Sequence, residues 1–142
     1  LDNIRAVKEA SGDISQVAEI ARLVDDDFAI YSGNDDMIVP LLSLGGQGVI
    51  SVVANILPKD THDMVHFYLD GQVERARELQ LGMKALIDAL FIEVNPIPVK
   101  EAMNLLGMEV GLPRLPLVPM ADSNRQQLIR AIKDYGIDQW GD

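Results

Sequence analysis

The chain has 142 residues, 48% of them hydrophobic, and a formal net charge of −10, which is enough for one domain with its own core. The acidic balance argues against binding to nucleic acid or to an anionic membrane surface, and the lack of cysteine excludes disulfides and thiolate metal sites. Charged residues interrupt every long apolar run, so no transmembrane helix is expected and the default location is the cytoplasm.

The first predicted strand covers residues 4–8, and a tight turn leads from it into a helix. Side chains on a strand alternate between its faces, so Ile4, Ala6 and Lys8 share one face. We expect a buried strand, whose apolar surroundings would lower the pKa of Lys8 and favour the free amine, the nucleophile of Schiff-base chemistry. The plainer alternative is a lysine that reaches past the strand end into water, which is the commoner fate of lysines.

Two more strands are predicted at residues 28–32 and 49–53, each after a helix. Short connections in a strand–helix–strand–helix–strand order predict right-handed βαβ units on a parallel sheet. The glycine-rich residues 45–48 precede a strand rather than follow one, so they indicate the end of a helix and not a phosphate-binding loop.

Polar residues mark where the first two helices begin. Asp13 followed by Gln16 is an Asp variant of the capping box, and Asn34 or Asp35 can cap the second helix, which runs to Leu44. The local sequence therefore predicts side-chain caps at both helix starts.

Only helices are predicted after residue 57. They cover residues 58–69, 73–91 and 99–106, and a last one that Asp122 or Ser123 caps and that ends near Gly136. Prolines predict an extended segment at residues 95–98 and an extended connector at residues 111–120, whose leucines and valine should pack along the body.

His62 and His66 have the i, i+4 spacing that can hold zinc on a helix. However, the sequence lacks the glutamate of a His-Glu-x-x-His motif and has no evident third ligand. They are interpreted as surface histidines, and neither a metal nor a cofactor is expected.

Four stretches of the chain resemble the dihydrodipicolinate synthase family of class I pyruvate aldolases, in the order in which that family carries them. The stretches are Val7-Lys8-Glu9-Ala10-Ser11-Gly12-Asp13, Tyr31-Ser32-Gly33-Asn34-Asp35-Asp36, Gly45-Gly46-Gln47-Gly48-Val49-Ile50-Ser51-Val52 and Asn95-Pro96-Ile97-Pro98-Val99-Lys100. The resemblance implies an α/β fold, the C-terminal part of a (β/α)8 TIM barrel. Its last three strands would lie in residues 1–57 and an all-helical C-terminal region in residues 58–142. A complete barrel needs about 250 residues, so the whole barrel is not in this chain.

The resemblance also implies a site at the carboxyl ends of the strands, where barrel enzymes carry their active groups. Lys8 would form a Schiff base with pyruvate, and the resulting enamine would attack L-aspartate semialdehyde. The backbone of Ile50 would contact pyruvate, and Gly33 would line the pocket.

The family's carboxylate-binding, proton-relay and aldehyde-binding groups come from the first part of the barrel. Tyr31, Tyr68 and Tyr135 cannot stand in for that relay, so the isolated chain is expected to be inactive. Its expected partners are the missing barrel half or a second copy, and a homo-oligomer is expected.

Two other functions remain open: another pyruvate aldolase such as N-acetylneuraminate lyase, and a non-catalytic assembly module. Ser11-Gly12-Asp13 and Asn95-Pro96-Ile97-Pro98 favour the synthase.

Overall fold

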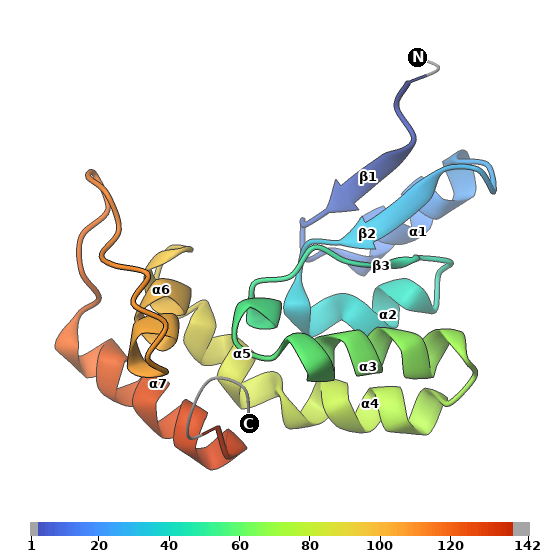
Figure 1. The fold of residues 1–142 in the computed structure, drawn as a ribbon. Coiled ribbons are helices and arrows are strands. Elements are labelled where there is room, and N and C mark those ends of the chain that lie inside the picture. The colour runs from blue at the N-terminus through green and yellow to red at the C-terminus, as the bar shows by residue number, and fades with distance from the viewer. Residues whose placement is uncertain (1–2, 138–142) are drawn as a thin grey trace. The chain divides into compact units, whose positions relative to one another are not determined.

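The computed structural model describes residues 3–137, in which three parallel strands alternate with two helices and are followed by further helices (Figure 1). The strands are β1 (Ala6–Glu9), β2 (Ala29–Ser32) and β3 (Gly48–Val49). The α-helices are α1 (Ile14–Leu23), α2 (Ile38–Leu42), α3 (Pro58–Leu69), α4 (Val73–Gly82), α5 (Lys84–Leu90), α6 (Ile97–Leu105) and α7 (Asp122–Tyr135). Two short 3₁₀ turns, η1 (Asp35–Met37) and η2 (Val53–Asn55), complete the described elements.

The chain divides into two compact units. The first consists of residues up to Ser51 together with Lys59–Gln80, and the second of Val52–Pro58 together with residues from Leu81 onward. The division follows spatial packing, whereas the boundary expected after residue 57 follows the order of strands and helices along the chain.

The three strands form one parallel sheet in the order β1–β2–β3, as the sequence predicts. In its register Lys8 lies beside Tyr31, and Tyr31 beside Gly48. Paired residues on neighbouring strands point to the same face, so these three form a row across one side of the sheet.

The helices α1 and α2 cover the other side of the sheet (Figure 1). Val17 of α1, Ile30 of β2 and Leu41 of α2 form a buried cluster, against which Val7 of β1 also packs. Gln80 of α4 joins the α2 region to this unit, because its amide accepts from the Val39 N–H at 3.0 Å and donates to the Asp35 carbonyl at 2.8 Å. The first unit is thus a sheet with one face packed against helices.

The prediction that the first strand is buried is wrong for the face that carries Lys8. Ile4 is 53% exposed, and Ala6 and Lys8 are exposed as well, whereas Glu9 is buried. The apolar core forms on the Val7 side because α1 and α2 pack there.

The third strand is also shorter than predicted, since it ends at Val49 rather than Val53. Val53 and Ile56 are 0% and 4% exposed, and they stand three positions apart in and beside η2. Three-residue spacing places both on one side of a 3₁₀ turn, which is why an unbroken apolar run here did not mean a strand.

In the second unit α5, α6 and α7 pack together, and a distant carboxylate caps α7. Glu93 accepts from the Ala121 N–H at 3.0 Å and from the Asn124 side chain at 2.9 Å. The predicted caps Asp122 and Ser123 are wrong, because α7 already includes Asp122 and its N-cap is Ala121. The predicted stop is confirmed: Gly136 takes the left-handed conformation at φ 89°.

The helix predicted at residues 73–91 is two helices. α4 ends at Gly82 and α5 begins at Lys84, with Met83 fully buried between them. Glycine weakens a helix interior by about 0.5–1 kcal/mol relative to alanine, so it is a favourable place to interrupt a continuous apolar stripe.

Residues 97 and 98 are helical, not extended, because α6 begins at Ile97. Pro98 lies in the first turn, where a backbone N–H has no helical acceptor in any case, so proline is tolerated there.

The connector after α6 is irregular, as predicted, but of its leucines and valine only Leu117 is even half-buried. Leu112, Leu115 and Val118 are 64%, 86% and 56% exposed. Lys100 and Asn104 of α6 donate to backbone carbonyls only at the start of this segment. Its prolines lack backbone donors, so the later part has fewer ways to attach to α6.

Among residues 3–137, no helix is both long and apolar enough to cross a membrane.

Candidate functional site

Lys8 lies one residue before the end of β1, on the exposed face of the sheet. Its strand neighbour on that face is Tyr31, whose ring lies against Gly48. A Cβ built on Gly48 would be 3.4 Å from two ring carbons. The Lys8 side chain therefore projects from the exposed face of the sheet near the carboxyl ends of the strands, and solvent can reach it.

Gly33 follows β2 directly and leaves space for the lysine side chain. A Cβ built on Gly33 would lie 2.5 Å from the Cβ of Ala10 and 2.7 Å from the Cε of Lys8. Real Cβ atoms essentially never approach other atoms under 3.0 Å. The Gly33 N–H donates to the Glu9 carbonyl at 2.6 Å, which holds the two loops together. Residue 33 must therefore lack a side chain. Lys8 and Gly33, both predicted from the sequence as site residues, lie in contact.

Ile50 comes one residue after β3, so it lies at the same end of the sheet. Its N–H donates to the Ser32 carbonyl at 2.8 Å, and its side chain is 51% exposed. Because this N–H is already hydrogen-bonded to Ser32, a ligand that contacts the Ile50 backbone would do so through the carbonyl group.

The predicted site residues thus lie at the carboxyl ends of three neighbouring parallel strands. This is the end at which (β/α) barrels carry their active groups. An exposed primary amine with a close-packed side-chain stem can attack a carbonyl carbon and form an imine. The burial that was expected to favour the free amine is missing, since Lys8 is exposed.

The sequence analysis missed Glu9, the residue beside the lysine. Its side chain is on the opposite face of β1 and is 5% exposed. Glu9 Oε1 accepts from the Ser11 N–H and from Gln16 Nε2, each at 2.9 Å. The second bond overturns the predicted capping box, because Gln16 reaches Glu9 and not the backbone of Asp13, while Asp13 caps α1 by accepting from the Ser15 N–H at 2.8 Å. Strand parity gives this result only when Lys8 is known to face outward, because neighbouring residues of a strand point to opposite faces.

The turn after β2 also differs from its prediction. The Asn34 side chain makes no capping bond to η1. Instead the Ser32 hydroxyl donates to the Asn34 carbonyl at 2.8 Å and accepts from the Asn34 N–H at 3.2 Å. Ser32 is 1% exposed, so this local ring of bonds fixes the turn that contains Gly33.

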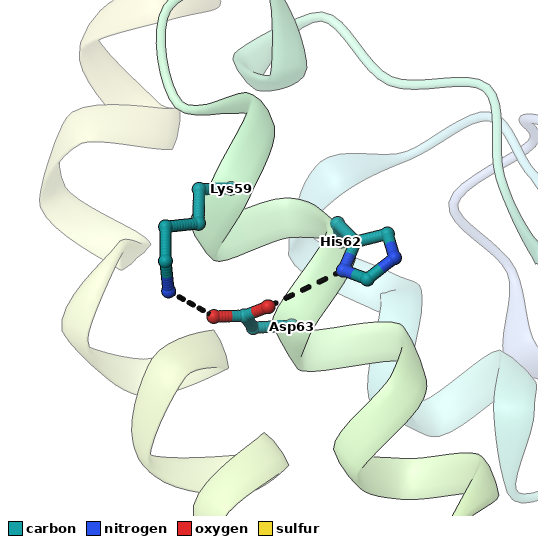
Figure 2. A network of polar contacts seen from close by, with 3 residues as sticks. All are labelled: Lys59, His62 and Asp63. Atoms are coloured by element: carbon teal, nitrogen blue, oxygen red, sulfur yellow. Dashed lines mark hydrogen bonds and ion pairs between the residues drawn. The ribbon is translucent and has the colours of Figure 1, made fainter. Parts of the chain in front are cut away.

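The histidines of α3 are on the surface, as predicted. His62 and His66 are exposed, with ring centroids 4.1 Å apart. Figure 2 shows that the Asp63 carboxylate lies between Lys59 and His62, and it bonds Nζ of the first and, at 3.2 Å, Nδ1 of the second. The Lys59 hydrogen bond, followed by that of His62, holds the pKa of Asp63 below its ordinary value. No group of three potential metal ligands is found in residues 3–137.

The other tyrosines lie in helices, Tyr68 in α3 and Tyr135 at the end of α7, as the sequence predicts.

Comparison with known proteins gives one consistent family. A family model described as "Dihydrodipicolinate synthetase family" matches residues 1–135. The 4-hydroxy-tetrahydrodipicolinate synthase of Caldicellulosiruptor saccharolyticus is 66% identical over 97% of this chain and 46% of its own length.

Solved structures agree. The dihydrodipicolinate synthase of Thermotoga maritima matches with a TM-score of 0.93 at 42% identity, over 96% of this chain and 47% of that one. The enzyme of Cyanidioschyzon merolae, solved with lysine bound, matches with a TM-score of 0.91 at 44% identity, over 96% of this chain and 46% of that one. The chain spans about half the length of these relatives and has the fold of the C-terminal part of their TIM barrel. This chain belongs to the dihydrodipicolinate synthase family.

Proposed function

We propose that this chain is the nucleophile-bearing part of a 4-hydroxy-tetrahydrodipicolinate synthase of lysine and diaminopimelate biosynthesis. In a completed barrel Lys8 Nζ attacks the keto carbon of pyruvate, water leaves, and an imine forms. Loss of a methyl proton gives the enamine, whose carbon attacks the aldehyde of L-aspartate semialdehyde. Gly33 lines the pocket, and the Ile50 backbone carbonyl contacts pyruvate.

The contact between Lys8 and Gly33 is the observation that carries this proposal. Lys8 Cε lies 2.7 Å from the position that a Cβ of residue 33 would take, so the lysine stem packs against the turn after β2. The names of the relatives favour the synthase over N-acetylneuraminate lyase.

Exposure of Lys8 explains why the rest of the barrel is needed. Imine formation needs the free amine form of a lysine, which a site without water favours over the ammonium ion. We propose that the missing barrel half covers the exposed face of the sheet, removes water from Lys8 and supplies the proton relay and carboxylate-binding groups. Residues 1–57 would be its barrel partner, residues 58–142 a separate helical region, and the assembly a cytoplasmic homo-oligomer.

Borohydride trapping with pyruvate tests the proposal. In the completed barrel, reduction should add one pyruvate-derived mass to a peptide that contains Lys8, and Lys8→Ala should remove both the adduct and synthase turnover. Lys8→Arg is the matched control for charge, since it keeps a cation but has no amine that forms an imine. An adduct on Lys59 or Lys100 instead, or turnover in Lys8→Ala, would contradict the assignment, and an unchanged mass would favour the non-catalytic module.

A further inference from the structure

Glu9 is a buried carboxylate that the proposed reaction does not use. It is 5% exposed at the very end of β1, directly after the lysine. Burying a carboxylate is costly unless hydrogen bonds compensate for the lost water. Glu9 has two such bonds, from the backbone of Ser11 and from the side chain of Gln16, both at 2.9 Å.

Hydrogen bonds of residue 9 link three segments that meet at the end of β1, directly after Lys8. The Ser11 bond fixes the loop after β1, and the Gln16 bond fixes the first turn of α1. The Glu9 carbonyl accepts from the Gly33 N–H at 2.6 Å, which adds the turn after β2. Residue 9 is therefore a junction of the loop, the helix and the turn.

The loop that Glu9 holds also touches the space occupied by the lysine stem. Ala10 Cβ and Lys8 Cε both lie within 3 Å of the position that a Gly33 Cβ would take, at 2.5 and 2.7 Å. Ala10 lies between Glu9 and Ser11, the two ends of the 2.9 Å bond, so that bond restrains its position. If the hydrogen bonds to Glu9 were lost, the loop after β1 could move, and the surface that it forms beside Lys8 would change.

We propose that Glu9 is a positioning residue for Lys8: its buried carboxylate holds the loop and helix so that the amine meets the pyruvate carbonyl in the productive geometry. The proposal rests on the Schiff-base function of Lys8. Glu9 itself touches neither substrate nor the reacting atoms, and it acts through the loop. What it supplies is one oxygen that accepts two hydrogen bonds, so the amide oxygen of glutamine can replace it.

The test compares rates of imine formation in the completed barrel, by rapid borohydride quench and intact mass, over a range of pyruvate concentrations. Glu9→Ala should lower the maximal rate constant by about ten- to a hundredfold, the loss typical of a reacting group displaced by up to 1 Å. The pyruvate concentration at half-maximal rate should stay nearly unchanged, because other groups bind the carboxylate. Glu9→Gln should restore most of the rate.

Two controls separate positioning from stability and from charge. Val17→Ala removes buried packing from α1 without touching the loop, so it should lower the melting temperature and leave the rate constant of the folded molecules unchanged. Glu19→Ala removes an exposed carboxylate of the same helix, which pairs only with Arg22 in an i, i+3 ion pair, and it should change neither quantity.

The outcomes are distinct. A wild-type rate in Glu9→Ala overturns the positioning role while the function of Lys8 stands. An equal loss in Glu9→Gln also overturns it, because the proposed acceptor is retained there. Lack of a pyruvate adduct on wild-type Lys8 overturns the proposed function and this inference together.

Discussion

Replacing Gly33 with alanine tests the contact on which the site depends. The new methyl group would lie 2.5 Å from Ala10 Cβ, 2.7 Å from Lys8 Cε and 3.1 Å from the Glu9 carbonyl oxygen. Carbon atoms attract best at about 3.5–4.0 Å, so the first two contacts are each about 1 Å too close. The lysine stem can rotate away from the new methyl group, whereas the Cβ of Ala10 is fixed to the backbone, so Lys8 should move and the loop that carries Ala10 should shift with it.

Overpacking of this kind typically costs about 1–3 kcal/mol of stability, and a shift of about 1 Å at a reacting group can cost about a hundredfold in rate. We therefore expect Gly33→Ala to slow imine formation in the completed barrel by about a hundredfold, measured as pyruvate adduct per folded molecule after borohydride quench. Gly82→Ala is the matched control: a Cβ there meets no heavy atom within 4 Å, so the change should be neutral or slightly stabilising. Wild-type trapping in Gly33→Ala would refute the argument that space at residue 33 positions Lys8.

Three further predictions concern the chain as a whole and its surface. The lone chain should lose at least 10²–10⁴-fold in synthase activity because it lacks acid–base partners, and adding the complementary half should restore turnover in a coupled assay. Ile14, the first residue of α1, is 42% exposed, and Leu44, two residues after α2, is half-buried. We therefore expect self-association, which sedimentation should detect and Leu44→Asp should weaken; a monomer at micromolar concentration would contradict this. Because Lys59 lowers the pKa of Asp63 in the folded chain, the stabilisation from this pair is present above pH 3.8 and is lost as the pH falls through the lowered pKa. An NMR titration should give an Asp63 pKa under 3.8 that rises in Lys59→Ala, and equal values in both proteins would refute the link; the pair is exposed, so its effect on stability should be small.

The parts of the fold that local sequence determines were predictable. Glycine and aspartate signals placed α1 and the end of α7, and the alternation of strands and helices gave the parallel sheet. Lys8 and Gly33 were found through motifs, and their contact fits the order of the strands.

The parts that depend on distant contacts were not predictable. The cap of α7 is Glu93, about thirty residues earlier, and Gln16 bonds to Glu9 rather than to its own helix start. A capping pattern cannot reveal that a stronger partner lies elsewhere in the fold. The exposure of Lys8 was missed for a related reason: apolar periodicity shows which face of a strand can be buried, but not whether the chain brings an element to cover it.

The middle position of β2 has a consequence for the lifetime of the sheet. Among the described strands it alone has a hydrogen-bonded neighbour on each side, and Ile30, in its middle, is 4% exposed. Its amide protons should exchange with deuterium more slowly than those of β1, whose outer edge faces no described strand. Local opening of the edge strand β1 would then separate the segment that carries Lys8 from the sheet while β2 still pairs with β3. If a further strand docked against β1, hydrogen–deuterium exchange would slow selectively at the backbone amides of residues 6–9.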